Sequence, residues 1–597
     1  MTHERLLYLG DLSMLEAGQH QAFLWRMERL LNGQFTASSE DKTVESQAMH
    51  FYGKFFQKRR LGAKKVAASS TTGGLLVADQ EERINLKSLT PLEVRETGAE
   101  WLCWQAMEHL GLLDFLAAHT EWDEKERELM LLNLMGRLLY PVSERKTGLW
   151  VNEQSGAMPM MKAVEKAEVH GHSLCVAALR WLSAKDGLEG FLYGKIQESL
   201  GESGPKAALF DLTNVYFEGR MKGSSLAQFG RSKEKRMDAP LVSIGVLADE
   251  QGIIKRSHFY AGNVSEPGTL RAAVKDMGDA QGLLMDAGIA TKENIEFLAL
   301  SGIPYHCVVR QGFESYGIDY EQGQPFEHFT GNGYSYKIWL TVRQHEFTID
   351  GSSCSDWLIF VKSEAKEAKE DGIVGRQKER FERGLGQISA SLHKARGHKS
   401  KEQTHQRIGT LKARNQRVHA AFDIKLEDDG TNVTKMTWTC DPEMEKRNGT
   451  YVIRTSEKVE DAQAAWKKYH TLTKVEEVNR CCKTDLNMRP VYHQEDETIK
   501  AHLFLTLLAC TIVGFIRLKL AQAGILWSWK EIVRVMNTQK VVFSKFSNQQ
   551  DELFLLSNWS EPEEKAKAIY DALQLPYKAH NGFFIKISPQ IKGRGSP

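Results

Sequence analysis

The alternation of apolar and polar positions changes character along the chain and divides it into blocks. Over residues 91–204 apolar residues recur at helical spacing, as Leu129, Leu132 and Met135 illustrate. The Gly- and Pro-containing stretch 201–205 ends this block. The pattern therefore predicts a mainly helical region before residue 205.

From residue 205 to residue 310 the apolar positions form short runs, which are typical of strands. Two runs flank the turn DEQG and predict a hairpin. The full order predicted is three strands in a meander, then helix, strand, helix and strand. This order indicates an α/β fold with a ribonuclease-H-like mixed sheet.

The pattern is interrupted after residue 310 and resumes near residue 450. Strand-like segments and a basic helical segment between these points predict an inserted, mainly β domain with a basic arm. A helix over 461–486 follows, and then an apolar helix over 500–520. The expected organisation begins with an N-terminal helical and linker region that could bind DNA ends (1–90) and a helical domain for DNA binding or dimer contacts (91–204). The core follows in two parts (205–310 and 450–530), separated by the insertion (311–449). A helical C-terminal region (531–597) ends the chain.

Composition narrows the class of protein. A chain of 597 residues is too long for one hydrophobic core, and 42% hydrophobic with 26% charged residues is ordinary for a globular protein. The eight cysteines form no C-x-x-C pair, which favours a reducing, cytoplasmic setting. The apolar run 503–516 is shorter than the roughly 20 residues of a membrane span, so we expect a buried core helix.

Charge is informative in its distribution, because the net charge is only +1. Residues 376–417 hold many more Lys and Arg than acids, which predicts a phosphate-binding surface that includes Arg407, Lys412 and Arg414. A solvated helical face is the alternative. A smaller basic cluster at 57–65 is a second candidate for contact with DNA.

Two aspartates follow apolar runs that are predicted to be neighbouring strands. Asp211 follows Ala-Ala-Leu-Phe, and Asp286 follows Gly-Leu-Leu-Met. Either residue alone is typical of a turn or helix cap. Two carboxylates at matching strand ends would repel each other unless a cation lay between them. The pair therefore predicts a site for divalent cations with oxygen ligands, which suits Mg²⁺.

A third acid lies on the predicted helix that follows the insertion. Tyr469, Glu476 and Lys483 are spaced by seven and would share one stripe, with Arg480 one turn beyond the glutamate. Glu477 is a rival carboxylate, but one helical step turns it about 100° away. Glu476 is therefore predicted to complete the metal site, with the other three residues contacting phosphates. A surface helix with Glu–Arg support is the alternative.

Other residues are expected to be structural. His493 and His502 lack metal-ligand spacing and are predicted to serve core or capping roles. Trp438 and Trp466 are predicted to be buried rather than available to stack on a base.

These motifs together resemble a DDE transposase of a bacterial insertion sequence. The group in question has a β-domain inserted before the catalytic Glu and a Tyr-x2-Arg-x3-Glu-x6-Lys signature, which Tyr469, Glu476 and Lys483 match, with Leu472 in place of Arg. The subgroup with V-E-x-x-x-R, R-P-[VI]-x-H and A-H-L fits better, since the chain reads VEEVNR, RPVYH and AHL in that order. GRSKEKRMD and HFYAGNVSEPGTL resemble two further segments of the family.

The resemblance covers residues 205–310 and 450–520. It implies a catalytic and metal-binding triad of Asp211, Asp286 and Glu476 with two Mg²⁺ ions, for which Mn²⁺ would substitute. It also implies cleavage at terminal inverted repeats, joining of 3′-hydroxyl ends to target DNA, a homodimer on DNA, and a bacterial, nucleoid-associated protein. Lys233 and Arg236 would contact a strand. Two other functions stay open: a catalytically silent DNA-binding protein, and a structure-specific nuclease.

Overall fold

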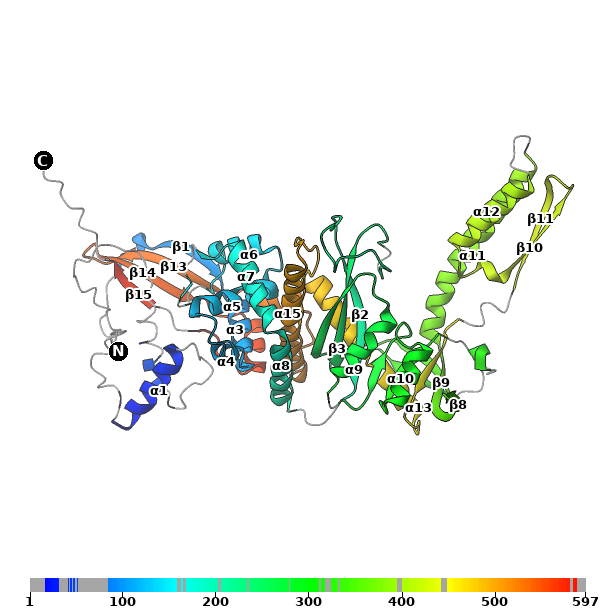
Figure 1. The fold of residues 1–597 in the computed structure, drawn as a ribbon. Helices are drawn as coiled ribbons and strands as arrows, with labels where there is room; N and C mark the ends of the chain where they lie inside the picture. The colour runs from blue at the N-terminus through cyan, green and yellow to red at the C-terminus, as the bar shows by residue number, and fades with distance from the viewer. Residues whose placement is uncertain are drawn as a thin grey trace.

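A computed structural model gives the fold of most of the chain (Figure 1). It describes residues 15, 17–31, 41, 43–45, 47–48 and 51, and residues 84–587 except 158–160, 162, 165–167, 202–205, 234–235, 279, 311–312, 317–323, 331–332, 395–399, 442–447 and 580–582. The basic cluster predicted at 57–65 and much of the predicted region 1–90 lie outside the described residues. The fold is mixed α/β.

The centre of the protein is a nine-stranded mixed sheet with the strand order β4-β3-β2-β5-β6-β12-β9-β8-β7. Neighbouring pairs are antiparallel except β2–β5 and β5–β6, which are parallel. The predicted order of three strands, helix, strand, helix and strand is confirmed for β2 to β6. The strands are β2 (Ala208–Tyr216), β3 (Leu241–Asp249), β4 (Ile254–Ala261), β5 (Leu283–Met285), β6 (Tyr305–Val309), β7 (Gln324–Phe329), β8 (Ser335–Ile349), β9 (Ser352–Ser363) and β12 (Thr450–Thr455).

Both faces of β2 are covered, which explains why its sequence is a nearly continuous apolar run. Phe210 and Leu212 pack into a core with α9 (Leu270–Lys275) and α10 (Lys292–Leu300). Leu209 and Val215, on the opposite face, join the larger core that contains α14 (Thr473–Arg480) and α15 (Asp496–Gln522). Helices on both faces thus hold β2 in the centre of the molecule.

The described residues of 98–200 fold as six helices, as the 3.6-residue periodicity of 91–204 predicts, and several of them pack against the long helix α15 (Asp496–Gln522). Residues 91–96, which were predicted to be helical, belong to a strand instead, because they pair with the C-terminal region. Helix α15 is long and apolar enough to cross a membrane by length and composition alone, and 89% of its apolar window is buried in the fold. The predicted core helix is therefore confirmed. The six helices are α3 (Gly98–His109), α4 (Leu112–Ala118), α5 (Glu124–Leu139), α6 (Glu144–Glu153), α7 (Gly171–Ser183) and α8 (Lys185–Leu200).

The C-terminal region contains strands where helices were predicted. A four-stranded sheet has the order β1-β13-β14-β15, which joins residues 90–96 to the C-terminal region. The prediction of a helical C-terminal region is wrong here, because KVVFSKFS lies in a sheet once it pairs with β1, and LFLLSNW pairs with it in turn. The elements are β1 (Thr90–Glu96), α16 (Trp529–Met536), β13 (Lys540–Ser547), β14 (Leu553–Trp559), α17 (Glu564–Ala572) and β15 (Phe583–Ile587).

The segment between β6 and β12 divides into two parts. Strands β7, β8 and β9 extend the main sheet through the pairing of β9 with β12. The remainder forms an arm with its own small core around Phe381 and Phe422, and Figure 1 shows this arm projecting from the sheet. The arm consists of α11 (Glu364–Leu392), α12 (Lys401–Arg414), β10 (Phe422–Asp428) and β11 (Val433–Cys440).

The single helix predicted over 461–486 is three segments. Helix α13 (Ala462–His470) ends before a turn at residues 471–472, α14 (Thr473–Arg480) follows, and a π-helical turn occupies Cys481–Asp485. The uninterrupted stripe expected from the seven-residue spacing is therefore wrong, since a break and a π-turn each change the rotation per residue.

Candidate active site

The register of the sheet brings two of the predicted acids together. Phe210 of β2 pairs with Met285 of the parallel strand β5. Asp211 and Asp286 are the residues that follow this pair, so they lie side by side. Asp211 does not end its strand as predicted, because β2 continues to Tyr216. The short strand β5 ends at Met285, so its pairing with β2 stops at Phe210.

Lys233 reaches this edge from the loop between β2 and β3. Its Nζ atom lies 3.3 Å from Asp211 Oδ1 and 2.5 Å from the carbonyl oxygen of Leu212. Glu266 Oε1 lies 3.8 Å from the same ammonium group. Burial disfavours the charged lysine, but the carboxylates of Asp211, Glu266 and Asp286 outweigh it and raise the pKa of Lys233.

Asp211 is held in an environment that opposes its charge. Burial raises the pKa of the Asp211 carboxyl, the Lys233 ammonium lowers it, and the charge of Asp286 raises it, with a net rise above the ordinary value. Asn479 donates from Nδ2 to Asp211 Oδ2 over 2.9 Å. One carboxylate oxygen thus faces a cation and the other faces an amide donor on α14.

Asp286 is fixed by the turn that follows β5. The backbone N–H groups of Gly288 and Ile289 donate to its Oδ1 atom over 2.8 and 3.2 Å. A Cβ atom at Gly288 would lie 2.5 Å from Glu266 Oε2 and 3.1 Å from Asp286 Oδ1. The absent side chain at Gly288 therefore lets the Glu266 carboxylate lie beside Asp286.

The predicted third acid lies on the same helix as Asn479. Glu476 is exposed on α14, and no described hydrogen bond or ion pair joins it to Asp211 or Asp286. Burial raises the pKa of the Tyr469 phenol, and the charges of Asp286 and Glu476 add to this rise. Tyr469 therefore lies within electrostatic reach of both acids, although it belongs to α13.

The other predicted DNA contacts lie at varying distances from these acids. Arg480 pairs with Asp485 Oδ2 over 3.7 Å and is half exposed, and Lys483 follows it in the π-turn. Arg236 pairs with Asp238 over 2.9 Å in the same loop as Lys233. Arg407, Lys412 and Arg414 lie on α12 of the projecting arm, apart from β2 (Figure 1).

Sequence reasoning missed Asn479 and Glu266. Asn479 lies three residues after Glu476, so the helical spacing that selected Glu476 also covers it. Glu266 lies within the family-like segment HFYAGNVSEPGTL, yet nothing in that segment reveals its contact with Lys233. Trp466 is buried as predicted, while Trp438 is partly buried in the arm.

The two histidines expected to lack a metal-ligating arrangement converge on Glu144. His493 Nε2 and His502 Nδ1 lie 3.3 and 3.2 Å from its carboxylate, and the ligand atoms of all three lie within 4.8 Å of one another. The guanidinium of Arg137 lies 3.1 Å from His502 Nδ1. A metal bound between the two histidines and Glu144 would need this nitrogen as a ligand, so the arginine competes with it. Burial and the Arg137 charge lower the pKa of His502 to about 4. The cluster is thus a buried polar network joining α6 to α15.

Comparison with known proteins adds no relative. No protein-family model matches the chain. No curated protein matches it either.

Proposed function

We propose that this protein is a DNA transposase that cleaves at the terminal inverted repeats of its mobile element and joins the 3′-hydroxyl ends to target DNA. The observation that carries the proposal is the pair of acids at one edge of the sheet: Asp211 lies in β2, Asp286 directly follows the parallel neighbour β5, and the Lys233 ammonium interacts with their carboxylates. Carboxylates clustered in a partly buried site are costly unless a cation is present. A site that holds a cation among carboxylates suits phosphodiester chemistry.

The residues present fit Mg²⁺. The Lys233 ammonium is held by a carboxylate oxygen and a carbonyl oxygen, and such oxygen donors are the ligands that hard divalent cations prefer. Asp211, Asp286 and Glu476 would hold two Mg²⁺ ions, with Mn²⁺ as a substitute. When bound, the ions would supply Lewis-acid activation of a water or 3′-hydroxyl and neutralise developing charge on the phosphate. Asn479 would orient Asp211 through its 2.9 Å hydrogen bond.

The strand order supports the assignment of a ribonuclease-H-like core. In the succession β4-β3-β2-β5-β6, in which β2, β5 and β6 are parallel, Asp211 lies in the central strand β2 and Asp286 follows its neighbour β5. The segment between β6 and β12 would be the inserted domain, with basic residues of its arm on DNA. The proposed DNA contacts are Tyr469, Arg480, Lys483, Lys233, Arg236, Arg407, Lys412 and Arg414. A homodimer in the bacterial nucleoid would bring two element ends together.

The test is Mg²⁺-dependent cleavage and joining of DNA that flanks the gene. Wild type is compared with Asp286→Ala and with the matched control Asp186→Ala, whose side chain is 99% exposed. We expect cuts at inverted repeats in wild type and in the control, and none in Asp286→Ala or in EDTA. Binding to the ends should persist in Asp286→Ala, because that substitution removes a metal ligand and leaves the basic surfaces intact.

Three other results would change the proposal. If wild type binds the ends without cutting in Mg²⁺ or Mn²⁺, a catalytically silent DNA-binding protein is the better description. If wild type cuts without regard to the ends, a structure-specific nuclease is the better description. If Asp286→Ala cuts as well as wild type, the site is misassigned.

A further inference from the structure

Strand β2 leads from the proposed active site to a second surface. Tyr216 is the last residue of β2, and at roughly 3.3 Å per residue it lies about 16 Å along the strand from Asp211. The guanidinium of Arg236 lies 4.6 Å from the centre of the Tyr216 ring, and that of Arg489 lies 4.9 Å from it. Two arginines from distant parts of the chain thus stack on one tyrosine.

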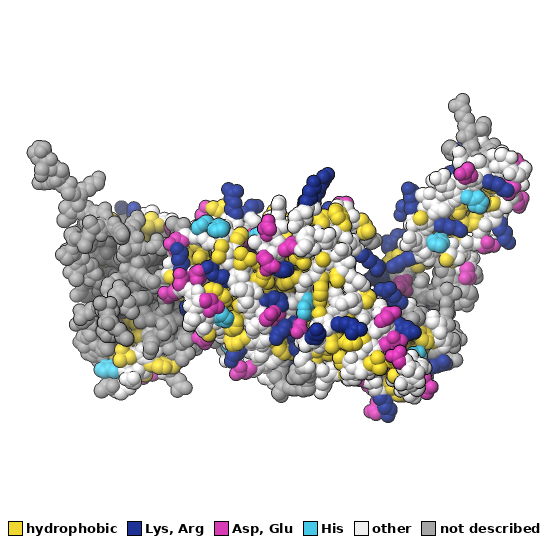
Figure 2. All heavy atoms as spheres, in the orientation of Figure 1, with side chains coloured by type: hydrophobic (Ala, Val, Ile, Leu, Met, Phe, Trp, Pro, Cys, Tyr) yellow, Lys and Arg dark blue, Asp and Glu magenta, His cyan; other side chains and the backbone are white. Residues whose placement is uncertain are grey.

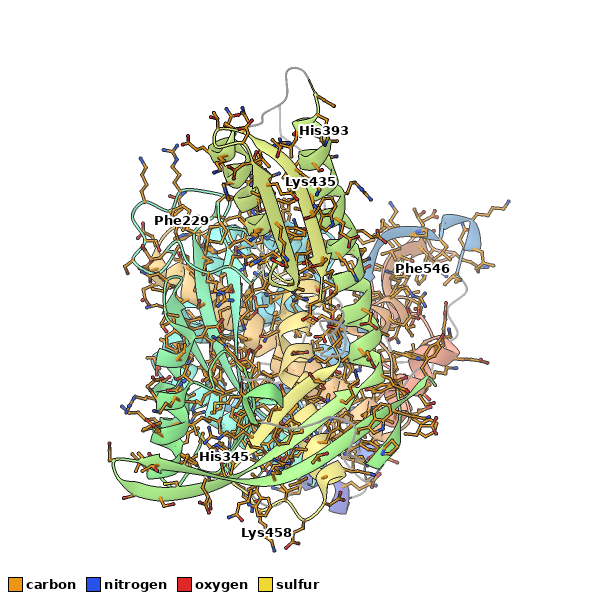
Figure 3. All side chains as sticks on the ribbon, turned by 90° about the vertical axis from the view of Figure 1, so that its right-hand side faces the viewer. Phe229, His345, His393, Lys435, Lys458 and Phe546 are labelled. Carbon is orange, nitrogen blue, oxygen red and sulfur yellow. The ribbon has the colours of Figure 1, made fainter. Side chains whose placement is uncertain are left out.

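Large apolar side chains project into solvent from the two segments that carry these arginines, the loop 217–238 and residues 489–492. Phe229 is 59% exposed, Met237 is 71% exposed and Tyr492 is 68% exposed. Figure 3 shows Phe229 on the loops beyond the sheet, at the margin of the molecule. A single exposed apolar side chain is ordinary, but several on segments that also carry the arginine pair are typical of a binding surface.

The two segments are connected to each other and to the end of the sheet. The backbone N–H of Ser225 donates to Asp496 Oδ2 over 3.0 Å, which joins the 217–238 loop to the start of α15. Gln228 bridges to Leu241, the residue that pairs with Tyr216 in the sheet. These connections bring the segments to one end of the sheet. We call this end the loop surface and define it by Tyr216, Phe229, Arg236, Met237, Arg489 and Tyr492.

The charge around the loop surface favours an anionic partner. Arg220, Lys222 and Arg231 of the 217–238 loop are exposed, and Figure 2 shows Lys and Arg side chains projecting where Figure 1 has the loops at the end of the sheet. Arg236 is paired with Asp238 and Glu218, but exposed pairs of this kind are weak and yield readily to a phosphate.

We infer that the loop surface binds an unpaired stretch of DNA next to the phosphodiester that is cut, with the arginines on phosphates and Phe229, Met237 and Tyr492 on an exposed base. This inference rests on the proposed transposase function. A basic groove with interleaved aromatic side chains is the arrangement that binds single strands, because every base offers a face for stacking. In a paired duplex those faces are covered by neighbouring bases, so the apolar side chains discriminate in favour of an unpaired strand.

A second copy of this chain fits the loop surface less well. A twofold interface would place the same basic loop against itself, and the like charges would repel. DNA supplies both the negative charge and the flat apolar faces.

The experiment compares two fluorescein-labelled duplexes of the gene-flanking DNA in EDTA, one fully paired and one with three unpaired nucleotides at one end. The variant is Phe229→Ala with Tyr492→Ala, and the matched control is Tyr334→Ala with Leu526→Ala, whose side chains are 76% and 82% exposed. We expect the variant to bind the partly unpaired probe about tenfold more weakly, as the loss of base stacking predicts. Binding to the paired probe, and both affinities of the control, should stay within about twofold of wild type.

Equal affinity of the variant and wild type for the partly unpaired probe would overturn the inference. So would a change in oligomeric state of the variant, measured by light scattering, with unchanged DNA affinity, since the partner would then be a second copy. Wild type that binds neither probe would contradict the proposed function itself. Circular dichroism and melting temperature of the variant confirm that a lost affinity is not a lost fold.

Discussion

Replacing Lys233 with glutamine tests whether the acids around it need a cation. The substitution keeps much of the side-chain length and removes the positive charge that lies 3.3 Å from Asp211 Oδ1. At this distance Coulomb's law gives about 1 kcal/mol in bulk water and about 5 kcal/mol at an effective dielectric constant of roughly 20. The Lys233 side chain is 34% exposed, so solvent screening reduces the expected loss of stability to about 1–2 kcal/mol.

The assay is thermal unfolding followed by circular dichroism, with and without Mg²⁺. Without divalent ions, Lys233→Gln should melt roughly 2–8 °C below wild type if the core unfolds as a unit of about 150–250 residues. Mg²⁺ should raise the melting temperature of the variant more than that of wild type, because no lysine then competes for the carboxylates. Lys195→Gln removes an exposed ion pair with Glu198 and should shift melting by less than about 2 °C.

The reasoning would be refuted by a Lys233→Gln protein that melts with wild type in EDTA. Equal stabilisation of both proteins by Mg²⁺ would show that Lys233 does not occupy the position of the cation. A drop shared equally by Lys195→Gln would show that the effect is a general one of lost surface charge.

Two further predictions concern Asn479 beside Asp211 and His502 in the buried network between α6 and α15. Asn479→Ala should lower the cleavage rate about 10- to 100-fold by freeing Asp211, with DNA affinity unchanged. The control Glu477→Ala, on the same helix, should cleave as wild type does. Equal cleavage rates for the two variants would contradict the role of Asn479. Because burial lowers the pKa of His502 from 6.5 to about 4, the unfolded chain binds more protons in that interval, and stability is complete above pH 6.5 and lost as the pH falls. His502→Gln should therefore lose less melting temperature than wild type between about pH 7.5 and about pH 5, and an equal loss in both proteins would exclude His502 as a source of the acid sensitivity.

Local pattern was a good guide to elements whose burial follows from their own residues. The continuous apolar runs of β2 and β3 and the apolar helix α15 were identified because each is covered on all sides, which leaves few polar positions. Pattern failed for β13 and β14, whose sheet depends on pairing with β1, more than four hundred residues earlier in the chain. It also failed at residues 471–472, where a turn separates Tyr469 from Glu476 within a stretch that looks helical throughout.

The sequence by itself determined which acids follow apolar runs, and therefore that Asp211 and Asp286 were candidates for one site. Only the tertiary structure decided which groups meet them: Lys233 from a loop, Glu266 from the segment after β4 and Asn479 from α14. The reason is physical. Strand and helix periodicity reflects which side of an element is buried, a property of neighbouring residues. The partners of a buried carboxylate are set by sheet register and helix packing, which join residues that lie hundreds of positions apart.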